Sequence, residues 1–299
     1  MFVPPPWIYV REISLQEDNE NSLSPFDIEV ENLDSLSVDE IYTLLDDIKE
    51  NGERWETNFY INNDKLAKMI ENNQIGFLST AESCVILWKR SRDFQIYYFS
   101  VNLDDLGILL QILQSNTNLP LVVNVLSSNA SIQNMDLYLA KYKFSKYCIL
   151  RRMVRINKET RELPDIKKYK LQVSDAEYIY DIMADNLDTV SDQLPDIEEI
   201  RSAISNGEII GVRSDTTGKV VSLIWYSVSG KSLELKYWVG DRAESGKQNG
   251  RAIYSVFEEY TKGFKKIFLF CHIGAWAESF YMKHDFKRDT VSDNVYVHY

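Results

Sequence analysis

The chain has 299 residues and a formal net charge of -12 at pH 7, and 44% of its residues are hydrophobic, including 18 Tyr, 13 Phe and 6 Trp. This length predicts two domains, and the aromatic content can supply a core for each. The acidic charge argues against nucleic acid and anionic membranes as main partners. No apolar run approaches the roughly 20 residues of a membrane helix, and the N-terminus lacks a signal-peptide pattern, so we expect a cytoplasmic protein.

Alternating and helical apolar periods predict a regular series of elements in the first half of the chain. A capping box at Ser37-x-x-Glu40 marks the first helix. In chain order we predict a strand, two helices, three strands, a helix, a strand, a helix and a strand, at Phe26 to Glu31, Ile41 to Glu50, Asp64 to Asn72, Ile75 to Ser79, Cys84 to Trp88, Phe94 to Val101, Asp104 to Leu113, Leu121 to Leu126, Ile132 to Lys141 and Tyr147 to Ile156.

A charged segment, Asn157 to Lys168, interrupts this series and contains Pro164. It predicts a boundary between domains 26–157 and 158–299, which follow an N-terminal extension, 1–25. In the second domain we predict a strand, two helices, three strands, a helix, a strand, a helix and one or two final strands, at Tyr169 to Val173, Ser174 to Asn186, Ile197 to Ser205, Ile209 to Arg213, Val220 to Val228, Leu233 to Val239, Arg251 to Thr261, Lys265 to His272, Ala275 to Lys283 and Lys287 to Tyr299.

A polar loop, Asp241 to Arg251, lies between the end of a predicted strand and the start of a predicted helix. Free backbone N–H groups in such a loop, together with the helix dipole, attract an anionic pyrophosphate. The loop therefore predicts a phosphate-bearing cofactor, and a solvated glycine turn is the alternative interpretation.

Two segments match patterns of one known family. Ser245 to Gly250 lies over Arg/Gln-x-x-Gly-x-Gly/Ala, with Ser245 and Gln248 as departures. Ala277 to Phe286 lies over Ala-x-x-x-Tyr-x-x-x-Gly-Phe, with Asp285 in place of Gly. On these motifs, residues 168–299 resemble the GCN5-related N-acetyltransferase (GNAT) family. The resemblance implies an α+β fold, with a central, mostly antiparallel sheet and helices on both faces.

The resemblance also implies an activity and a site. A GNAT domain transfers an acyl group from acetyl-CoA, or another acyl-CoA, to a primary amine by direct attack, and it needs no metal. Tyr281 matches the family tyrosine that protonates the departing thiolate, and a tyrosine packed in the core is the alternative. The implied cofactor-binding residues are Val239, Ser245, Gly246, Lys247, Gln248, Asn249, Gly250 and Arg251.

The base that deprotonates the amine has two candidates. Glu234 lies on the strand that leads into the loop, where GNAT domains often carry a carboxylate. By period-two alternation it shares a face with Lys236 and Trp238, so an exposed ion pair with Lys236 is the alternative. His272, at the end of the next strand, is the second candidate, because imidazole accepts protons near neutral pH.

The sequence shows no spacing typical of a metal site. The three histidines, His272, His284 and His298, do not fall at helical or cysteine-partnered intervals. Cys84, Cys148 and Cys271 lie in apolar, strand-like runs without paired spacing, which predicts buried, reduced thiols.

The first domain repeats the order of elements but not the loop. Leu137 to Phe144 echoes the Tyr281 segment, although Tyr138 is six residues before Phe144 and Tyr281 is five before Phe286. The matching loop, Asn102 to Asp105, is acidic and lacks glycine, so it would repel a pyrophosphate. We therefore expect a degenerate GNAT-like domain without a cofactor site, which forms one wall of the acceptor cleft. The alternatives are a domain that only stabilises the fold and a separate recognition module joined by the linker, Asn157 to Lys168.

The acceptor is a small-molecule or peptide amine of unknown identity. Acidic residues are concentrated between 176 and 205, which indicates either a cationic acceptor or a solvated helix face; among them are Asp181, Asp185, Asp188, Asp192, Asp196, Glu198 and Glu199. A non-catalytic binding or scaffold protein is the alternative function, with Ser245 and Gln248 as signs of a decayed loop. The acidic charge argues against an aminoacyl transferase that uses charged tRNA.

Overall fold

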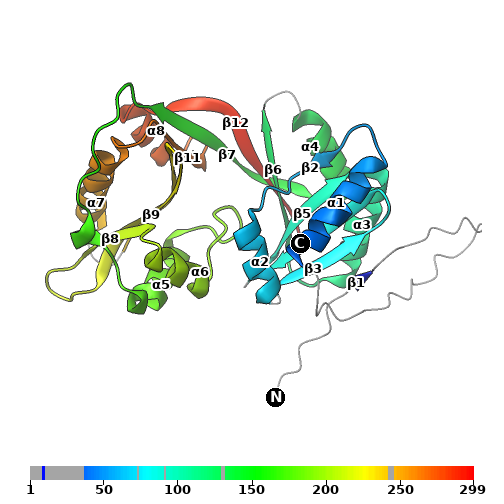
Figure 1. Ribbon diagram of the computed structural model, residues 1–299, viewed down its shortest axis with the longest axis horizontal. Coiled ribbons are helices and arrows are strands. Elements are labelled where there is room, and N and C mark those ends of the chain that lie inside the picture. Colours follow the sequence, from blue (N-terminus) through cyan, green and yellow to red (C-terminus); the bar gives the residue numbers. More distant parts are fainter. Residues whose placement is uncertain (1–8, 11–36, 73, 91, 129–131, 242–245) are drawn as a thin grey trace, which may run out of the picture. The chain divides into compact units, whose positions relative to one another are not determined.

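The structure is a computed structural model that describes residues 9–10, 37–72, 74–90, 92–128, 132–241 and 246–299 (Figure 1). The predicted strand Phe26 to Glu31 lies outside these residues. The chain forms two compact units, which do not coincide with two consecutive stretches of sequence. The first unit comprises Met1–Leu126, Gln133–Tyr147 and Val295–Tyr299, and the second comprises Ser127–Ile132 and Cys148–Asn294.

The sheet of the first unit is mostly antiparallel, in the order β1-β3-β4-β5-β6. Its strands are β1 (Tyr9–Val10), β2 (Glu56–Thr57), β3 (Ile75–Ser79), β4 (Ser83–Lys89), β5 (Phe94–Ser100) and β6 (Leu121–Ser128). β3, β4 and β5 pair antiparallel, whereas β5 and β6 pair in parallel. The two-residue strands β1 and β2, which the periodicity did not predict, pair with β3 and β5.

Helices cover both faces of this sheet. They are α1 (Val38–Glu50), α2 (Asn63–Glu71), α3 (Leu103–Asn116) and α4 (Ile132–Lys141). The predicted capping box is confirmed, because the Ser37 side chain accepts from the Glu40 N–H and the Glu40 carboxylate accepts from the Ser37 N–H. On one face, α1 and α2 pack on Phe77 and Ile86; on the other, α3 and α4 pack on the neighbouring residues Leu78 and Val85. Successive side chains of β3 and β4 thus point to opposite faces of the sheet and pack in two separate cores.

The second unit repeats this plan in the strand order β8-β9-β10-β11-β7-β12. Its strands are β7 (Ser145–Ile156), β8 (Ile209–Arg213), β9 (Val220–Ser229), β10 (Ser232–Gly240), β11 (Lys266–His272) and β12 (Lys287–His298). β8, β9 and β10 pair antiparallel, β10 and β11 pair in parallel, and β7 pairs antiparallel with β11. Residues 148–156 of β7 and 287–294 of β12 belong to this unit, while the remainder of both strands belongs to the first.

Helices again cover both faces. They are α5 (Ala176–Asn186), α6 (Ile197–Ser205), α7 (Gly246–Thr261) and α8 (Trp276–Lys283). α5 and α6 pack on a core with Leu223 and Trp225, and α7 and α8 on a core with Ile224 and Tyr226. The predicted fold class, a mostly antiparallel sheet with helices on both faces, is therefore confirmed. No helix among the described residues is both long and apolar enough to cross a membrane.

One predicted strand is wrong. Of residues 169–173, Tyr169 ends the 3-10 helix η1 (Lys167–Tyr169) and Val173 begins the 3-10 helix η2 (Val173–Asp175). Between them, only Lys170 bridges to the sheet, at Ile210. The Asp175 carboxylate accepts a hydrogen bond from the Gln172 N–H at 2.7 Å, which bends the backbone into a turn. A local side-chain contact thus competes with the ladder that the alternating pattern predicts.

Candidate functional site

Two parallel strands of the second unit stop pairing before they end. The β10–β11 ladder joins Ser232–Leu235 to Lys266–Leu269, yet β10 continues to Gly240 and β11 to His272. The carboxyl ends of parallel strands, where neighbouring chains part, are the usual place for ligands in mixed α/β sheets. The ends of β10 and β11, where the two strands no longer pair with each other, therefore define the candidate site.

A β-bulge in β10 changes which side chains face which helices. The register with β9 shifts between Leu235 and Tyr237. Leu233, Leu235 and, after the bulge, Trp238 pack with α7 and α8, whereas Tyr237 and Val239 pack with α5 and α6. The prediction that Glu234 shares a face with Trp238 is wrong, because the extra residue of the bulge breaks the period of two between them.

Glu234 lies on the α5–α6 face, within the paired part of β10. Its carboxylate accepts a hydrogen bond from Ser227 Oγ at 3.2 Å, and its Cα is opposite Phe268 of β11. Lys236 directs its Nζ over the Trp225 ring, 5.7 Å from the ring centroid. The described contacts thus give Glu234 and Lys236 separate partners and no ion pair with each other.

The loop predicted to bind the cofactor, Asp241 to Arg251, is shorter than expected, because α7 begins at Gly246 rather than at the predicted Arg251. Ser245 lies outside the described residues, as do the side chains of Lys247 and Gln248. The first N–H groups of a helix have no partner within the helix, so the first turn of α7 is a place where backbone donors can meet an anion. Asn249 is half-buried and Arg251 is exposed on the following turn.

Gly250 faces the sheet. A Cβ at this position would lie 3.7 Å from Trp238 Nε1 and 3.9 Å from Ser222 Oγ, in ordinary van der Waals contact. A methyl group therefore fits between α7 and the strands β9 and β10, whereas a larger side chain would be directed at Trp238 and Ser222. The sequence pattern placed Gly250 among the residues that bind the pyrophosphate, and the geometry gives it a packing role beside that prediction.

Tyr281 is part of an aromatic cluster on the α7–α8 face. Its side chain is 6% exposed, and its ring centroid lies 6.3 Å from that of Trp238, 6.4 Å from Tyr254 and 5.5 Å from Phe286. Burial raises the pKa of the Tyr281 phenol, so this group stays protonated far above neutral pH. Cys271 lies in the same core, and burial raises the pKa of its thiol to about 11.

The segment after Tyr281 explains one departure from the family pattern. Asp285 has a φ of 64°, in the left-handed region that the Gly of the pattern adopts without strain. The Phe286 N–H then donates to the Tyr281 carbonyl at 3.1 Å, which closes the end of α8. Asp285 thus keeps the backbone path of the motif, because Asp is among the residues that best tolerate this region.

The loop between α5 and α6 reaches both unpaired strand ends, and sequence reasoning missed it. Tyr237 Oη on β10 donates to the carbonyls of Asp192 and Gln193, both at 2.9 Å. On β11, His272 Nε2 lies 3.3 Å from Ser191 Oγ and 4.0 Å from Asp192 Oδ1. The loop therefore links β10 to β11 beyond the point where their own ladder stops.

Several acidic residues of the α5–α6 region already have partners. Asp196 and Glu199 form the predicted capping box of α6, and Glu198 pairs with Arg201. Asp188 accepts hydrogen bonds from the N–H groups of Val190 and Ser191. Burial raises the pKa of the Asp192 carboxyl, the one of this group that lies beside His272.

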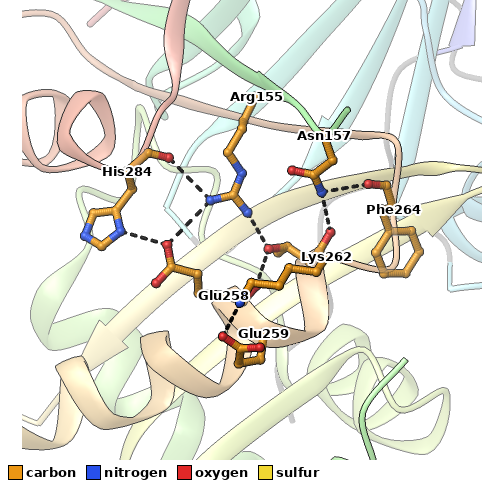
Figure 2. A network of polar contacts seen from close by, with 8 residues as sticks. Arg155, Asn157, Glu258, Glu259, Lys262, Phe264 and His284 are labelled. Carbon is orange, nitrogen blue, oxygen red and sulfur yellow. Dashed lines mark hydrogen bonds and ion pairs between the residues drawn. The ribbon is translucent and has the colours of Figure 1, made fainter. Parts of the chain in front are cut away.

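A polar network fixes the far end of α7 against β7 (Figure 2). Arg155 Nη1 donates to the His284 carbonyl at 3.3 Å and lies 3.7 Å from Glu258 Oε1, and Nη2 donates to Thr261 Oγ1. Asn157 Nδ2 donates to the Thr261 carbonyl at 2.9 Å. The last turn of α7 and the end of α8 are thus held by one strand, which orients both helices that cover Trp238 and Tyr281.

The described residues contain no group of three or more His, Cys, Asp or Glu side chains arranged to hold a metal ion. All three cysteines are free thiols. Cys84 and Cys271 are buried, as predicted, but Cys148 is only half-buried.

Solved structures share this arrangement over most of the chain. A GCN5-related N-acetyltransferase from Sphaerobacter thermophilus aligns over 86% of this chain and 91% of its own, at 10% identity and a TM-score of 0.51. A tandem GNAT protein from the clavulanic acid biosynthesis pathway aligns over 88% and 96%, at 9% identity and a TM-score of 0.50. A glucosamine N-acetyltransferase region of a fungal GH3 β-N-acetylglucosaminidase aligns over 87% of this chain and 36% of that one, at 12% identity and a TM-score of 0.57.

These likenesses show the fold. The chain has a tandem GNAT fold, since alignments over 86% to 88% of its length include both units. No protein-family model and no curated protein matches the sequence.

Proposed function

We propose that the second unit is an acyltransferase that moves an acyl group, acetyl in the first instance, from CoA to a primary amine. One observation carries this proposal: the β10 bulge, the end of the β10–β11 ladder, the start of α7 and Tyr281 converge in one unit. Structures with the same fold are N-acetyltransferases by name, which supports the same class of reaction here. The domain predicted as 158–299 corresponds to the second unit, which also includes Ser127–Ile132 and residues 148–157 and ends at Asn294.

The residues present fit an acyl-CoA. The helix N-terminus at the start of α7 and the exposed Arg251 suit a pyrophosphate. The end of β10 around Val239, which pairs with β9 but no longer with β11, suits an extended chain. When bound, the acyl-CoA supplies the thioester whose carbonyl carbon is attacked. We assign its binding to the full predicted set: Val239, Ser245, Gly246, Lys247, Gln248, Asn249, Gly250 and Arg251.

Tyr281 is the proposed proton donor to the thiolate that leaves. Its raised pKa keeps the proton on the phenol at neutral pH. Its ring, on α8, lies beside Trp238 of β10, the strand of the site. No protein group attacks the thioester in this scheme. The amine itself attacks the carbonyl carbon, so that the C–N bond forms and the C–S bond breaks without an acyl-enzyme intermediate. Its proton goes to a base on the α5–α6 face, where both Glu234 and His272 lie.

Calorimetry with acetyl-CoA tests the proposal on the full chain. We expect one CoA ester bound per chain and release of free thiol when a panel of primary amines is added. If no acetyl or longer acyl-CoA binds at millimolar concentration, the enzyme proposal falls. If acyl-CoA binds but no acceptor, water included, ever releases thiol, the alternative of a non-catalytic binding protein takes its place.

The acceptor that we propose is the amine of a small molecule or a peptide, in the cytoplasm, with no part for nucleic acid or membrane. The net charge of -12 supports this choice, because it disfavours polyanionic surfaces.

A further inference from the structure

His272 stands at the open end of the candidate site. Along β11, Ile267, Leu269 and Cys271 belong to the α7–α8 core, so His272 points to the α5–α6 face. It lies three residues beyond Leu269, where the β10–β11 ladder ends, which is about 10 Å along a strand. Glu234 shares this face but lies within the paired part of the sheet, opposite Phe268. Of the two, only His272 lies where the strands no longer pair.

Ser191 determines which nitrogen of His272 carries the proton. This serine is 2% exposed, and both its N–H, at 2.8 Å, and its Oγ, at 3.1 Å, contact Asp188 Oδ1. Ser191 also hydrogen-bonds with the Cys148 side chain. A hydroxyl has one proton, and a carboxylate is a stronger acceptor than a neutral thiol or a neutral imidazole. The proton therefore goes to Asp188, and Ser191 Oγ presents a lone pair to His272 Nε2 at 3.3 Å.

It follows that the neutral His272 ring carries its proton on Nε2 and its lone pair on Nδ1. The side chain is 40% exposed, so the ring is accessible to a ligand. Asp192 Oδ1 lies 4.0 Å from the same nitrogen, Nε2. The Asp192 backbone is held in turn by Tyr237 of β10. The loop thus fixes the tautomer and the position of one base.

We propose that His272 Nδ1 accepts the proton of the attacking amine, and that Ser191 and Asp192 are positioning residues for it. This inference rests on the proposed acyltransferase function. In the step, the amine nitrogen forms a bond to the thioester carbonyl carbon and the C–S bond breaks. The amine proton passes to Nδ1, and the thiolate takes a proton from Tyr281, so no oxidant or further reactant is required.

The tautomer is tested by long-range ¹H–¹⁵N spectra of the full chain labelled at histidine. The sequence has only three histidines, so His284→Gln and His298→Gln assign the signals. We expect the Nε2–H form for His272 in the wild type and a loss of this preference in Ser191→Ala. An Nδ1–H form in the wild type, or the same tautomer in Ser191→Ala, would overturn the proposal.

The role in catalysis is tested by thiol release from acetyl-CoA between pH 6 and 9, with water and with a panel of primary amines as acceptors. We expect His272→Gln to lower the rate by ~10²-fold or more without changing the affinity for CoA, and Glu234→Gln to lower it less. His298→Gln, in the first unit, is the control that keeps the wild-type rate.

The pH profile adds a second readout. Cys148 on β7, Asp188 and Asp192 in the loop and Asp293 on β12 interact electrostatically beside Ser191, so only the difference between wild type and variant is interpreted. We expect the acidic limb of the profile to disappear in His272→Gln. A variant with the wild-type rate and profile would reject His272 as the proton acceptor while leaving the acyltransferase function standing. A wild type that binds CoA but releases no thiol would reject both.

Discussion

The two units share one plan and differ at the place where a ligand would enter. In both, a parallel pair of strands stops pairing early: β5 and β6 pair only from Phe94 to Ile96, and β10 and β11 only from Ser232 to Leu235. In the second unit β10 carries a bulge at this point, whereas the described β4–β5 register in the first unit runs without a shift. The two units therefore share a topology but differ in the backbone of the strand that borders the candidate site, which is bulged in the second unit and regular in the first.

In the first unit a short segment of the chain occupies the place where the strands part. Asn58 Nδ2 donates to the carbonyls of Ile96 on β5, at 2.9 Å, and Asn124 on β6, at 3.0 Å. Asn58 Oδ1 accepts from the Tyr98 N–H at 2.6 Å, and the neighbouring residue Thr57 pairs with Phe99. This segment supplies the backbone groups of both strands with partners, which in an open site only a ligand would do.

The start of the helix differs as well. The Asn102 side chain accepts from the N–H groups of Asp104, at 3.0 Å, and Asp105, at 3.5 Å, so α3 is capped from within. Asp105 is buried and accepts a hydrogen bond from Thr80 Oγ1. The donors that would bind a pyrophosphate are thus already used, in addition to the acidic charge that the sequence shows.

The segment Leu137 to Phe144 repeats the backbone of the Tyr281 segment but not its tyrosine. The Phe144 N–H donates to the Leu139 carbonyl, as Phe286 N–H does to that of Tyr281, and Lys143 has a φ of 61° where Asp285 has 64°. Leu139, not Tyr138, therefore corresponds to Tyr281. The first unit keeps the backbone motif but has no phenol at this position, which supports a domain that packs rather than reacts.

The largest expected effect comes from Gly250→Asp, which should abolish binding of acetyl-CoA. The new carboxylate would point at Trp238 and Ser222, and burying it there would displace the start of α7. Calorimetry measures the loss. Gly250→Ala is the matched control, because a Cβ fits at ordinary contact distance, and it should bind CoA. Wild-type affinity in Gly250→Asp would contradict the assignment of the loop.

Removal of the phenol tests the difference between Tyr281 and Leu139. Tyr281→Phe keeps the ring packing and removes the proton donor, so turnover should fall by ~10²-fold or more while the affinity for CoA stays the same. Thiol release measures the rate. Leu139→Tyr in the first unit should add no activity. A fully active Tyr281→Phe enzyme would make this tyrosine a core residue only.

Asn58→Ala tests whether the first unit depends on its internal segment. Two carbonyls and one N–H lose their partner, so the free energy of unfolding should fall by roughly 2–4 kcal/mol. Thermal denaturation measures the change, and calorimetry should still find one CoA per chain. Asn58→Asp, which keeps the acceptor but loses both donors, should be destabilised as well. A second CoA bound by either variant would show that Asn58 alone had closed a working site.

The smallest effect is expected from reversing one exposed charge. Arg251→Glu on α7 should weaken CoA binding by roughly 3- to 10-fold, and the loss should shrink in high salt, because exposed charges are screened. Titrations at two salt concentrations measure both. Lys262→Glu, just past the far end of the same helix, is the control and should bind as the wild type does. Equal affinity in Arg251→Glu would remove this residue from the proposed pyrophosphate site.

The sequence by itself determined the order of helices and the fold class, and it showed that the segment after β5 in the first unit is acidic and lacks glycine. These features depend on local signals, such as the capping box at Ser37 and the acidic stretch after Asn102, which act between residues close in the chain. The strand predicted at 169–173 failed for the same reason, since a local contact of Asp175 overrode the pattern.

Tertiary structure alone decided which residues meet. The β10 bulge, which separates Glu234 from Trp238, depends on pairing with β9 and leaves no mark in the alternation of side chains. Ser191 and His272 are 81 residues apart in sequence, and Asn58 and Asn124 are 66 apart. Contacts over such separations form only when the sheet brings distant segments together, so a pattern of neighbouring residues does not predict them. The proposed base and the segment that fills the first unit could therefore be found only in the folded chain.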